Sequence, residues 1–179
     1  MKRNVLVFGS ISGLIIAALM VFSSIWCYKD PNFEANMVIG YATMLVSFSF
    51  IFVGIKNLRD KHNGGVITFG QAFKLGLYIS LIASSAYVAT WLVEYYFFIP
   101  DFMDKYGAHV IKEAQNSGAT QAELDKQIAK MDQYKEMYKN PVFVILLTYM
   151  EVLPLGIVIS VISAFILKRK AKADTVAVN

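Results

Sequence analysis

Four long apolar runs divide the chain, over residues 5–28, 37–55, 69–99 and 141–167. An α-helix rises about 1.5 Å per residue, so each run can cross a hydrocarbon core of about 30 Å. The third run would make a helix of about 46 Å, which must tilt or protrude. The pattern predicts an all-α fold, a four-transmembrane-helix bundle formed as one domain by residues 1–179.

The first run permits two other interpretations, a cleaved signal peptide and a lipoprotein anchor. Its 24 apolar residues follow Lys2 and Arg3, whereas the apolar region of a signal peptide has about 7 to 15. An anchor at Cys27 fits badly, because the bulky Trp26 precedes it where a small residue is expected. We therefore expect a retained first helix.

The one sizeable polar segment, residues 100–140, lies between the third and fourth runs. Apolar residues recur at helical spacing over residues 101–115, and a break at Asn116-Ser117-Gly118 follows. Thr120 and Glu123 then form a capping box that opens a second amphipathic helix. The segment is therefore predicted to form a short helical insertion. The apolar faces of its helices must pack against each other, the bundle, lipid headgroups or a partner protein.

Basic residues flank the runs. They are Lys2, Arg3, Lys56, Arg59, Lys61, Lys168, Arg169, Lys170 and Lys172. Short cationic segments are retained in the cytoplasm, so we expect a multi-pass protein of the cell (inner) membrane with both termini cytoplasmic. Residues 28–36 and the insertion would then be extracytoplasmic, and residues 168–179 a cytoplasmic tail ending in disorder. In the polar stretch 54–76, a capping box of Thr68 and Gln71 predicts that the third helix begins there.

Small residues recur at every fourth position in three of the runs, which places them on one helix face. These stripes are Gly9, Gly13 and Ala17; Ala72, Gly76, Ser80 and Ser84; and Gly156, Ser160 and Ala164. Lipid tails are as apolar as leucine, so close approach of backbones supplies much of the association between membrane helices. We expect the stripes to be the helix-packing faces of the bundle.

Several short segments carry a family resemblance. In order they are GIKNLRDK, a glycine-containing turn, ITFGQAFKLGL, MYKNP and PLGIVISVISAFILKRK. The chain thereby resembles, over nearly its whole length, the bacterial family called domain of unknown function 4199. The resemblance implies a four-helix integral membrane protein with an extracytoplasmic insertion between the third and fourth helices, and it supplies no catalytic or binding residues.

Composition agrees with a membrane protein, since 56% of the residues are apolar and the mean hydropathy is +0.50. The net charge of +4 could suggest nucleic acid, but the cations flank apolar runs, so we expect no nucleic-acid partner. The single cysteine excludes an intramolecular disulfide and a cysteine-based metal cluster. His109 lacks a second nitrogen or sulfur ligand, so we expect a solvated side chain there and neither metal nor cofactor.

Aromatic residues gather at the end of the third run: Trp91, Tyr95, Tyr96, Phe97 and Phe98. We interpret them as a belt at the outer interface and not as a cofactor box. Pro154 lies inside the fourth run, where it should kink the helix.

Two acidic residues, Glu94 and Glu151, lie within the runs. A carboxylate there is costly unless it faces the bundle, finds a partner or binds a proton, so we expect both to point inward or toward the interface, at similar depth. One hypothesis is that the two meet and share a proton. In the other, Glu94 reaches the outer headgroups, while Glu151 bonds to Tyr149 or to the carbonyl freed by Pro154.

No phosphate-binding glycine loop, serine elbow or zinc constellation occurs in the sequence. The main hypothesis is therefore a membrane protein that is not an enzyme and whose insertion binds a partner or the membrane surface. A small proton-linked transporter using Glu94 and Glu151 is the alternative, and an intramembrane enzyme is a second one. Expected partners are membrane lipids and another protein or a second copy, bound through the membrane helices or the insertion.

Overall fold

A computed structural model describes residues 1–29 and 37–170 of the chain. The elements, in order, are α1 (Lys2–Lys29), α2 (Met37–His62), α3 (Phe69–Val93), the π-helical turn η1 (Glu94–Phe98), α4 (Phe102–Asn116), α5 (Gln121–Tyr138) and α6 (Pro141–Leu167). Most of the turn expected at residues 28–36, and the end of the tail, lie outside the described residues.

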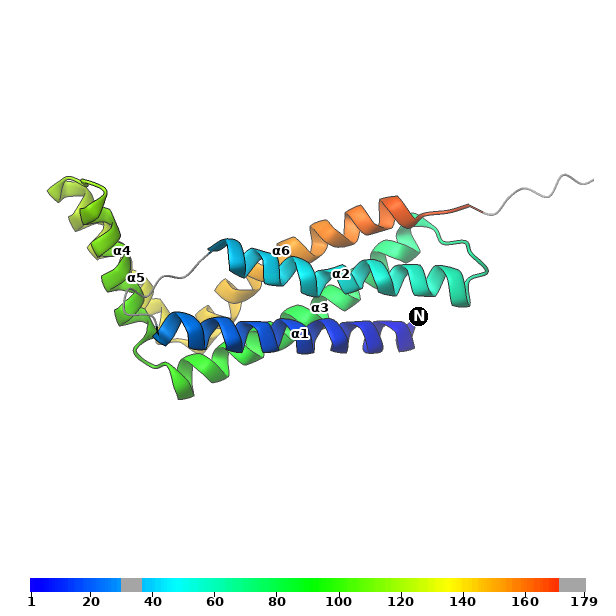
Figure 1. The fold of residues 1–179 in the computed structure, drawn as a ribbon, viewed down its shortest axis with the longest axis horizontal. Helices are drawn as coiled ribbons and strands as arrows, with labels where there is room; N and C mark the ends of the chain where they lie inside the picture. The colour runs from blue at the N-terminus through cyan, green and yellow to red at the C-terminus, as the bar shows by residue number, and fades with distance from the viewer. Residues whose placement is uncertain (30–36, 171–179) are drawn as a thin grey trace, which may run out of the picture.

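The four long helices confirm the predicted all-α bundle. The helices over residues 2–29, 38–62, 69–98 and 141–167 are each long and apolar enough to cross a membrane. They run side by side, with the shorter pair α4–α5 at one end (Figure 1). We call that end the hairpin end, and the end with the N-terminus and the C-terminal end of α6 the terminal end. The second helix is longer than the apolar run 37–55. Helix α2 continues to His62 through the basic residues that follow the apolar part.

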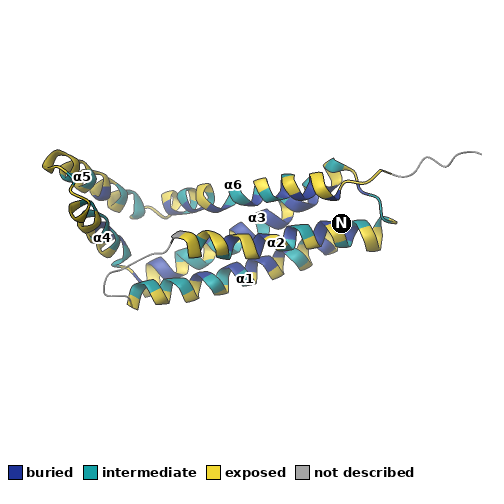
Figure 2. Ribbon diagram, turned by 45° about the horizontal axis from the view of Figure 1, so that its top comes forward, coloured by how far each residue is buried: buried dark blue, intermediate teal, exposed yellow. Residues whose placement is uncertain are grey.

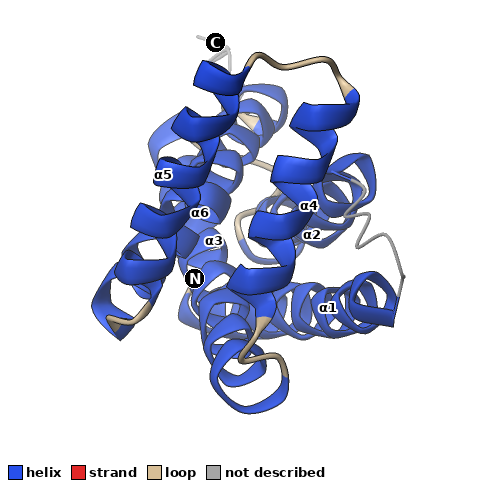
Figure 3. Ribbon diagram, turned by 90° about the vertical axis from the view of Figure 1, so that its left-hand side faces the viewer, coloured by secondary structure: helices blue, strands red, loops and turns tan. Residues whose placement is uncertain are grey.

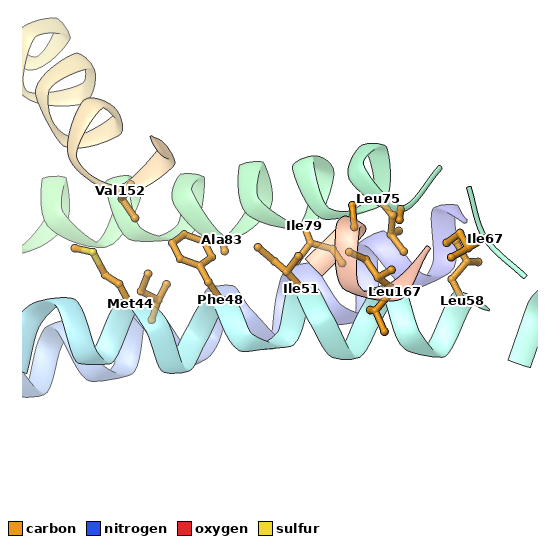
Figure 4. Close-up of a cluster of buried hydrophobic side chains, with 14 residues drawn as sticks. Met44, Phe48, Ile51, Leu58, Ile67, Leu75, Ile79, Ala83, Val152 and Leu167 are labelled. Carbon is orange, nitrogen blue, oxygen red and sulfur yellow. The ribbon is translucent and has the colours of Figure 1, made fainter. Parts of the chain in front are cut away.

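Helix α3 is the centre of the packing, since it contacts α1, α2 and α6, while α2 also contacts α1 and α6. Figure 3 shows this cluster of helices from the hairpin end. Phe48 and Ile51 from α2, with Leu75 and Ile79 from α3, are fully buried in the core (Figure 4). Exposed faces of the long helices point outward all along the bundle (Figure 2), as expected where lipid tails replace a protein neighbour.

Helix caps and one backbone bridge define the ends of α3 and α6. The predicted capping box at Thr68 is confirmed, because Gln71 N–H donates to its hydroxyl at 3.2 Å while the Gln71 side chain accepts from its N–H. Before this cap, Gly64 and Gly65 have φ of 60° and 82°, a region that favours glycine. Ile67 then forms an isolated antiparallel bridge with Arg169, so the chain after α6 is fixed to this loop.

The end of α3 departs from a regular α-helix. Ile99 N–H donates to the carbonyl of Glu94 at 2.9 Å, which closes a π-helical turn. Glu94 and Tyr95, the first two residues of this turn, are both buried. Helix α6 continues as one helix through Pro154, and the kink expected there stays a prediction.

Candidate functional site

Glu94 is a buried carboxylate in the hairpin half of the bundle. It is 7% exposed and lies at the start of η1. The hydroxyl of Ser24 on α1 donates to its Oε2 at 2.8 Å and to the carbonyl of Met20 at 2.9 Å. Glu94 therefore points into the bundle and joins the start of η1 to α1.

Glu151 has a different environment, because its residue surface is exposed. Its carboxyl group interacts with the hydroxyl of Tyr87 on α3. Tyr87 packs against the edge of the core and also lies within electrostatic range of Glu94. The carbonyl freed by Pro154 and the Tyr149 hydroxyl were the expected partners, but Tyr149 bonds instead to Ser85 at 2.7 Å.

The two carboxyl groups thus occupy separate places around Tyr87. Glu94 lies beside Ser24, whereas Glu151 lies beside Tyr87, which precedes Glu94 by seven residues on α3. Within residues 1–29 and 37–170, no hydrogen bond joins the two carboxylates directly. A proton shared between them stays a prediction, and Tyr87 is the group through which they would be linked.

Sequence reasoning missed Ser24 and Tyr87 as partners of the carboxylates. Both lie at seven-residue spacing from residues that it did single out: Ser24 follows Ala17, and Tyr87 precedes Glu94. Seven residues are close to two helical turns, so each pair shares a face. This spacing was the signal that could have found them.

The stripe residues lie at close approaches between helices. Ideal Cβ atoms at Gly9 and Gly13 would meet Ile82 and Ala86 of α3 at 2.9 and 3.0 Å. At Gly76 and Gly156 they would meet Ser160 and Ser80 at 2.9 and 1.9 Å. Of the other stripe members, Ala72, Ser84 and Ala164 are buried, and Ala17 is half-buried.

Several hydroxyl groups lie inside the bundle. The Ser12 hydroxyl donates to the Ser47 carbonyl at 2.7 Å and so connects α1 to α2, and Ser160 donates to the Gly156 carbonyl of its own helix at 2.7 Å. The buried hydroxyls of Ser80 and Ser84 have no hydrogen-bond partner. The α3–α6 contact is therefore close, and both helices contribute buried hydroxyl groups, Ser80 and Ser160, to it.

Helices α4 and α5 form a hairpin whose apolar faces cover each other. Met103 and Met131 are buried, and Gly107 permits close contact, since a Cβ there would lie 3.6 Å from the Met131 Cβ. The ammonium group of Lys135 on α5 donates to the Asp104 carboxylate on α4. Large apolar side chains on α4 and α5, both described throughout, are covered apart from Ile128 at 40% exposure.

A polar cluster ties the hairpin to α1. The Tyr28 hydroxyl donates to Asp101 at 2.5 Å, and the Lys105 ammonium lies 3.3 Å from the same carboxylate and 3.6 Å from the centre of the Tyr28 ring. The hydrogen bond from Tyr28, followed by that from Lys105, holds the pKa of Asp101 below its ordinary value.

Aromatic side chains tie the hairpin to α3. Trp91 meets Phe102 edge to face at 4.9 Å between ring centres, and Tyr95 meets Tyr138 at 5.3 Å. The Tyr96 hydroxyl donates to the Tyr138 carbonyl at 3.2 Å. The expected aromatic belt is thus divided: Trp91 and Tyr95 pack under the hairpin, while Phe97 and Phe98 are 79% and 72% exposed.

Acid should weaken the contact between the hairpin and α1 that Tyr28, Asp101 and Lys105 form. A carboxyl whose folded pKa is lowered stabilises the fold above its unfolded pKa of about 3.9, and this contribution is lost as pH falls through the folded pKa. Pepsin digestion at decreasing pH below about 4 should therefore cut the hairpin progressively faster. Tyr28→Phe should be cut faster than the wild type already at the upper end of this range. Equal cleavage of the two proteins there would contradict the tie.

Within the described residues, no three His, Cys, Asp or Glu side chains lie close enough together to hold one metal ion. His109 lies on α4, 3.8 Å from the Glu113 carboxylate. The candidate site is thus made of the two carboxylates with their hydroxyl partners and of the anchored hairpin.

Comparison with known proteins gives the family but no activity. No curated protein and no solved structure matches the chain. The family resemblance expected from the sequence is confirmed over nearly the whole chain. The sequence profile that matches residues 7–169 is described as "Protein of unknown function (DUF4199)", and the chain therefore belongs to that family.

Proposed function

We propose that this protein is a membrane-embedded support, not an enzyme, that holds the α4–α5 hairpin outside the cytoplasm for a protein partner. The observation that carries the proposal is that the hairpin is tied to two different membrane helices. Tyr28 of α1 bonds to Asp101, while Trp91 of α3 packs against Phe102 and Tyr95 of the adjoining turn η1 packs against Tyr138. A flexible linker between two spans needs no such contacts with the bundle. A helical pair that is held in one orientation for a binding partner does need them.

A protein partner fits the hairpin better than the membrane surface does. A helix that lies on a membrane turns a wide apolar face to the lipid. Here the apolar faces of α4 and α5 are turned to each other, and the outer surface carries charges of both signs, such as Lys112, Lys126 and Asp125. Mixed charge of this kind suits a polar protein surface of complementary charge.

Photocrosslinking in intact cells tests the proposal. A photoreactive residue at Lys112 or Lys126 should give a discrete adduct with another polypeptide. The same residue at Val158, a 52% exposed position of α6, serves as the lipid-facing control. Reversing the charges of Asp125 and Lys126 should remove the adduct without changing the melting temperature. Adducts with the protein itself alone, together with a hairpin deletion that has no phenotype, would contradict the proposal.

Orientation is a separate prediction, based on the cations that flank the spans. In a Cys27→Ser background, an impermeant maleimide should label Gln121→Cys on intact cells. Lys61→Cys should react only after the membrane is opened. The reverse labelling would place the hairpin in the cytoplasm.

Proton-linked transport is the second candidate function, favoured by the carboxylates in the spans. Glu94 is buried with a hydroxyl partner, and Glu151 interacts with Tyr87; ionisable groups at such depth mark proton or ion paths in many membrane proteins. Proton flux into proteoliposomes that is lost in Glu94→Gln or Glu151→Gln would favour this candidate. Flux equal to that of empty liposomes would exclude it.

A further inference from the structure

The segment after α6 is held against the terminal end of the bundle. Ile67 N–H donates to the Arg169 carbonyl at 3.0 Å, and Arg169 N–H donates to the Ile67 carbonyl at 2.9 Å. Ile67 itself is buried, and Arg59 of α2 donates to the Leu167 carbonyl at 3.4 Å. These bonds fix the backbone of residues 168–170, so their three exposed cationic side chains are carried at a defined place.

Positive charge is concentrated around this segment. The described part of the terminal end carries Lys2, Arg3, Lys56, Arg59, Lys61, Lys74, Lys168, Arg169 and Lys170. Asp60 is its one carboxylate in residues 1–4, 54–76 and 168–170, and it is paired with Arg59 at 2.6 Å. Lys56 and Arg169 lie within electrostatic range of the same carboxylate, which shows that α2 and the segment after α6 bring their cations together.

An apolar surface adjoins these cations. The Lys168 ammonium lies 4.8 Å from the centre of the Phe165 ring, and Phe165 packs on Phe69 at 4.6 Å. Phe165 is nevertheless 55% exposed, on a helix that is apolar enough to cross the membrane. A cation directly beside an exposed aromatic ring matches a molecule with an anionic group next to a hydrocarbon chain.

We propose that the terminal end binds anionic phospholipids, with the headgroup phosphate held by the cations of residues 168–170 and an acyl chain lying along Phe165. The charge excess supplies the attraction, since each lysine or arginine near an anionic membrane surface favours binding by about fivefold. The adjoining apolar ring selects a lipid over a free phosphate. This inference does not depend on the hairpin's role, because the two surfaces lie at opposite ends of the bundle (Figure 1).

Native mass spectrometry of the full-length protein, titrated in detergent with phosphatidylglycerol or phosphatidylcholine, tests the inference. The wild type should retain phosphatidylglycerol preferentially. Lys168→Gln combined with Arg169→Gln should weaken this binding by about 25-fold, from about fivefold for each cation. The backbone bridge should persist, because it uses no side chain, and an unchanged melting temperature will verify that the variant is folded.

The matched control removes two exposed cations from the hairpin, Lys112→Gln with Lys126→Gln, and should leave binding unchanged. Equal affinity for the two lipids, or an equal loss in the control, would overturn the inference. Displacement of phosphatidylglycerol by millimolar inorganic phosphate would also overturn it, since the site would then recognise a soluble anion. Resistance to phosphate, with loss only in the 168–169 variant, is the expected result.

Discussion

Gly156→Leu should unfold the bundle in detergent. A Cβ at this position would lie 1.9 Å from the Ser80 Oγ and 3.1 Å from the Phe48 ring. The Ser80 hydroxyl can rotate away from a methyl group, but a leucine also needs space that the Ser80 Cβ, 3.0 Å from the added Cβ, and the Phe48 ring occupy. Overpacking of this kind costs about 1–3 kcal/mol and occasionally more, and we expect the upper end. Tryptophan fluorescence during thermal unfolding will measure the loss.

Gly70→Leu is the control for this substitution, since no atom lies within 4 Å of an added Cβ there. It should melt within a few degrees of the wild type. Gly76→Leu and Gly13→Leu should destabilise less than Gly156→Leu, because their nearest contacts would be 2.9 and 3.0 Å. If all four variants melt alike, the small residues are not packing contacts and the arrangement of α1, α3 and α6 is wrong.

Glu94→Lys should have the second-largest effect. The carboxylate is 7% exposed and accepts a hydrogen bond from Ser24. An ammonium group cannot accept this bond, and it would place a positive charge in a buried position that holds no carboxylate to pair with it, at a cost on the order of 3 kcal/mol. Unfolding by a denaturing detergent, followed by circular dichroism, should show the loss.

Two control substitutions test whether the loss of stability in Glu94→Lys comes from the buried position of the side chain and not only from its charge or its depth in the membrane. Glu94→Gln keeps an acceptor for Ser24 and should remain close to wild-type stability. Val93→Lys adds the same cation at the same depth, but on a side chain that is 49% exposed and from which lysine can extend to the headgroups. A Val93→Lys protein as unstable as Glu94→Lys would show that depth, and not the inward position, decides the cost.

The membrane spans could be predicted from sequence because the length of each apolar run decides them. Apolar length sufficient to cross lipid is a local property, and so are the caps at Thr68 and Asn140 that begin α3 and α6. The hairpin was predictable for the same reason, from the break at Asn116-Ser117-Gly118 and the capping box at Thr120.

Helix partners could not be predicted, because they depend on which stripes meet. The sequence does not state that Gly156 meets Ser80 or that Glu94 meets Ser24, since each pair joins residues from different helices. The π-helical turn was also missed. It arises where Glu94 and Tyr95 are buried together, and no local pattern of apolar residues marks it.

The bridge between Ile67 and Arg169 is the clearest case of a missed contact. The basic residues after the last apolar run were expected to begin a cytoplasmic tail, and no contact with the rest of the chain was predicted for them. Their attachment depends on a loop about 100 residues earlier, whose two glycines with positive φ turn the chain toward α6. Only the folded arrangement brings the two segments together.

The unpartnered hydroxyls of Ser80 and Ser84 have a consequence for the biogenesis of the protein. Chains are made from the N-terminus, so α1, α2 and α3 are complete before the residues of α6 are synthesised. Until α6 arrives, Ser80 lacks the neighbour that Gly156 of that helix provides. Polar groups facing lipid favour association with another helix. We therefore expect this part of α3 to favour association with α6, and a chain that stops before residue 141 to lack that partner.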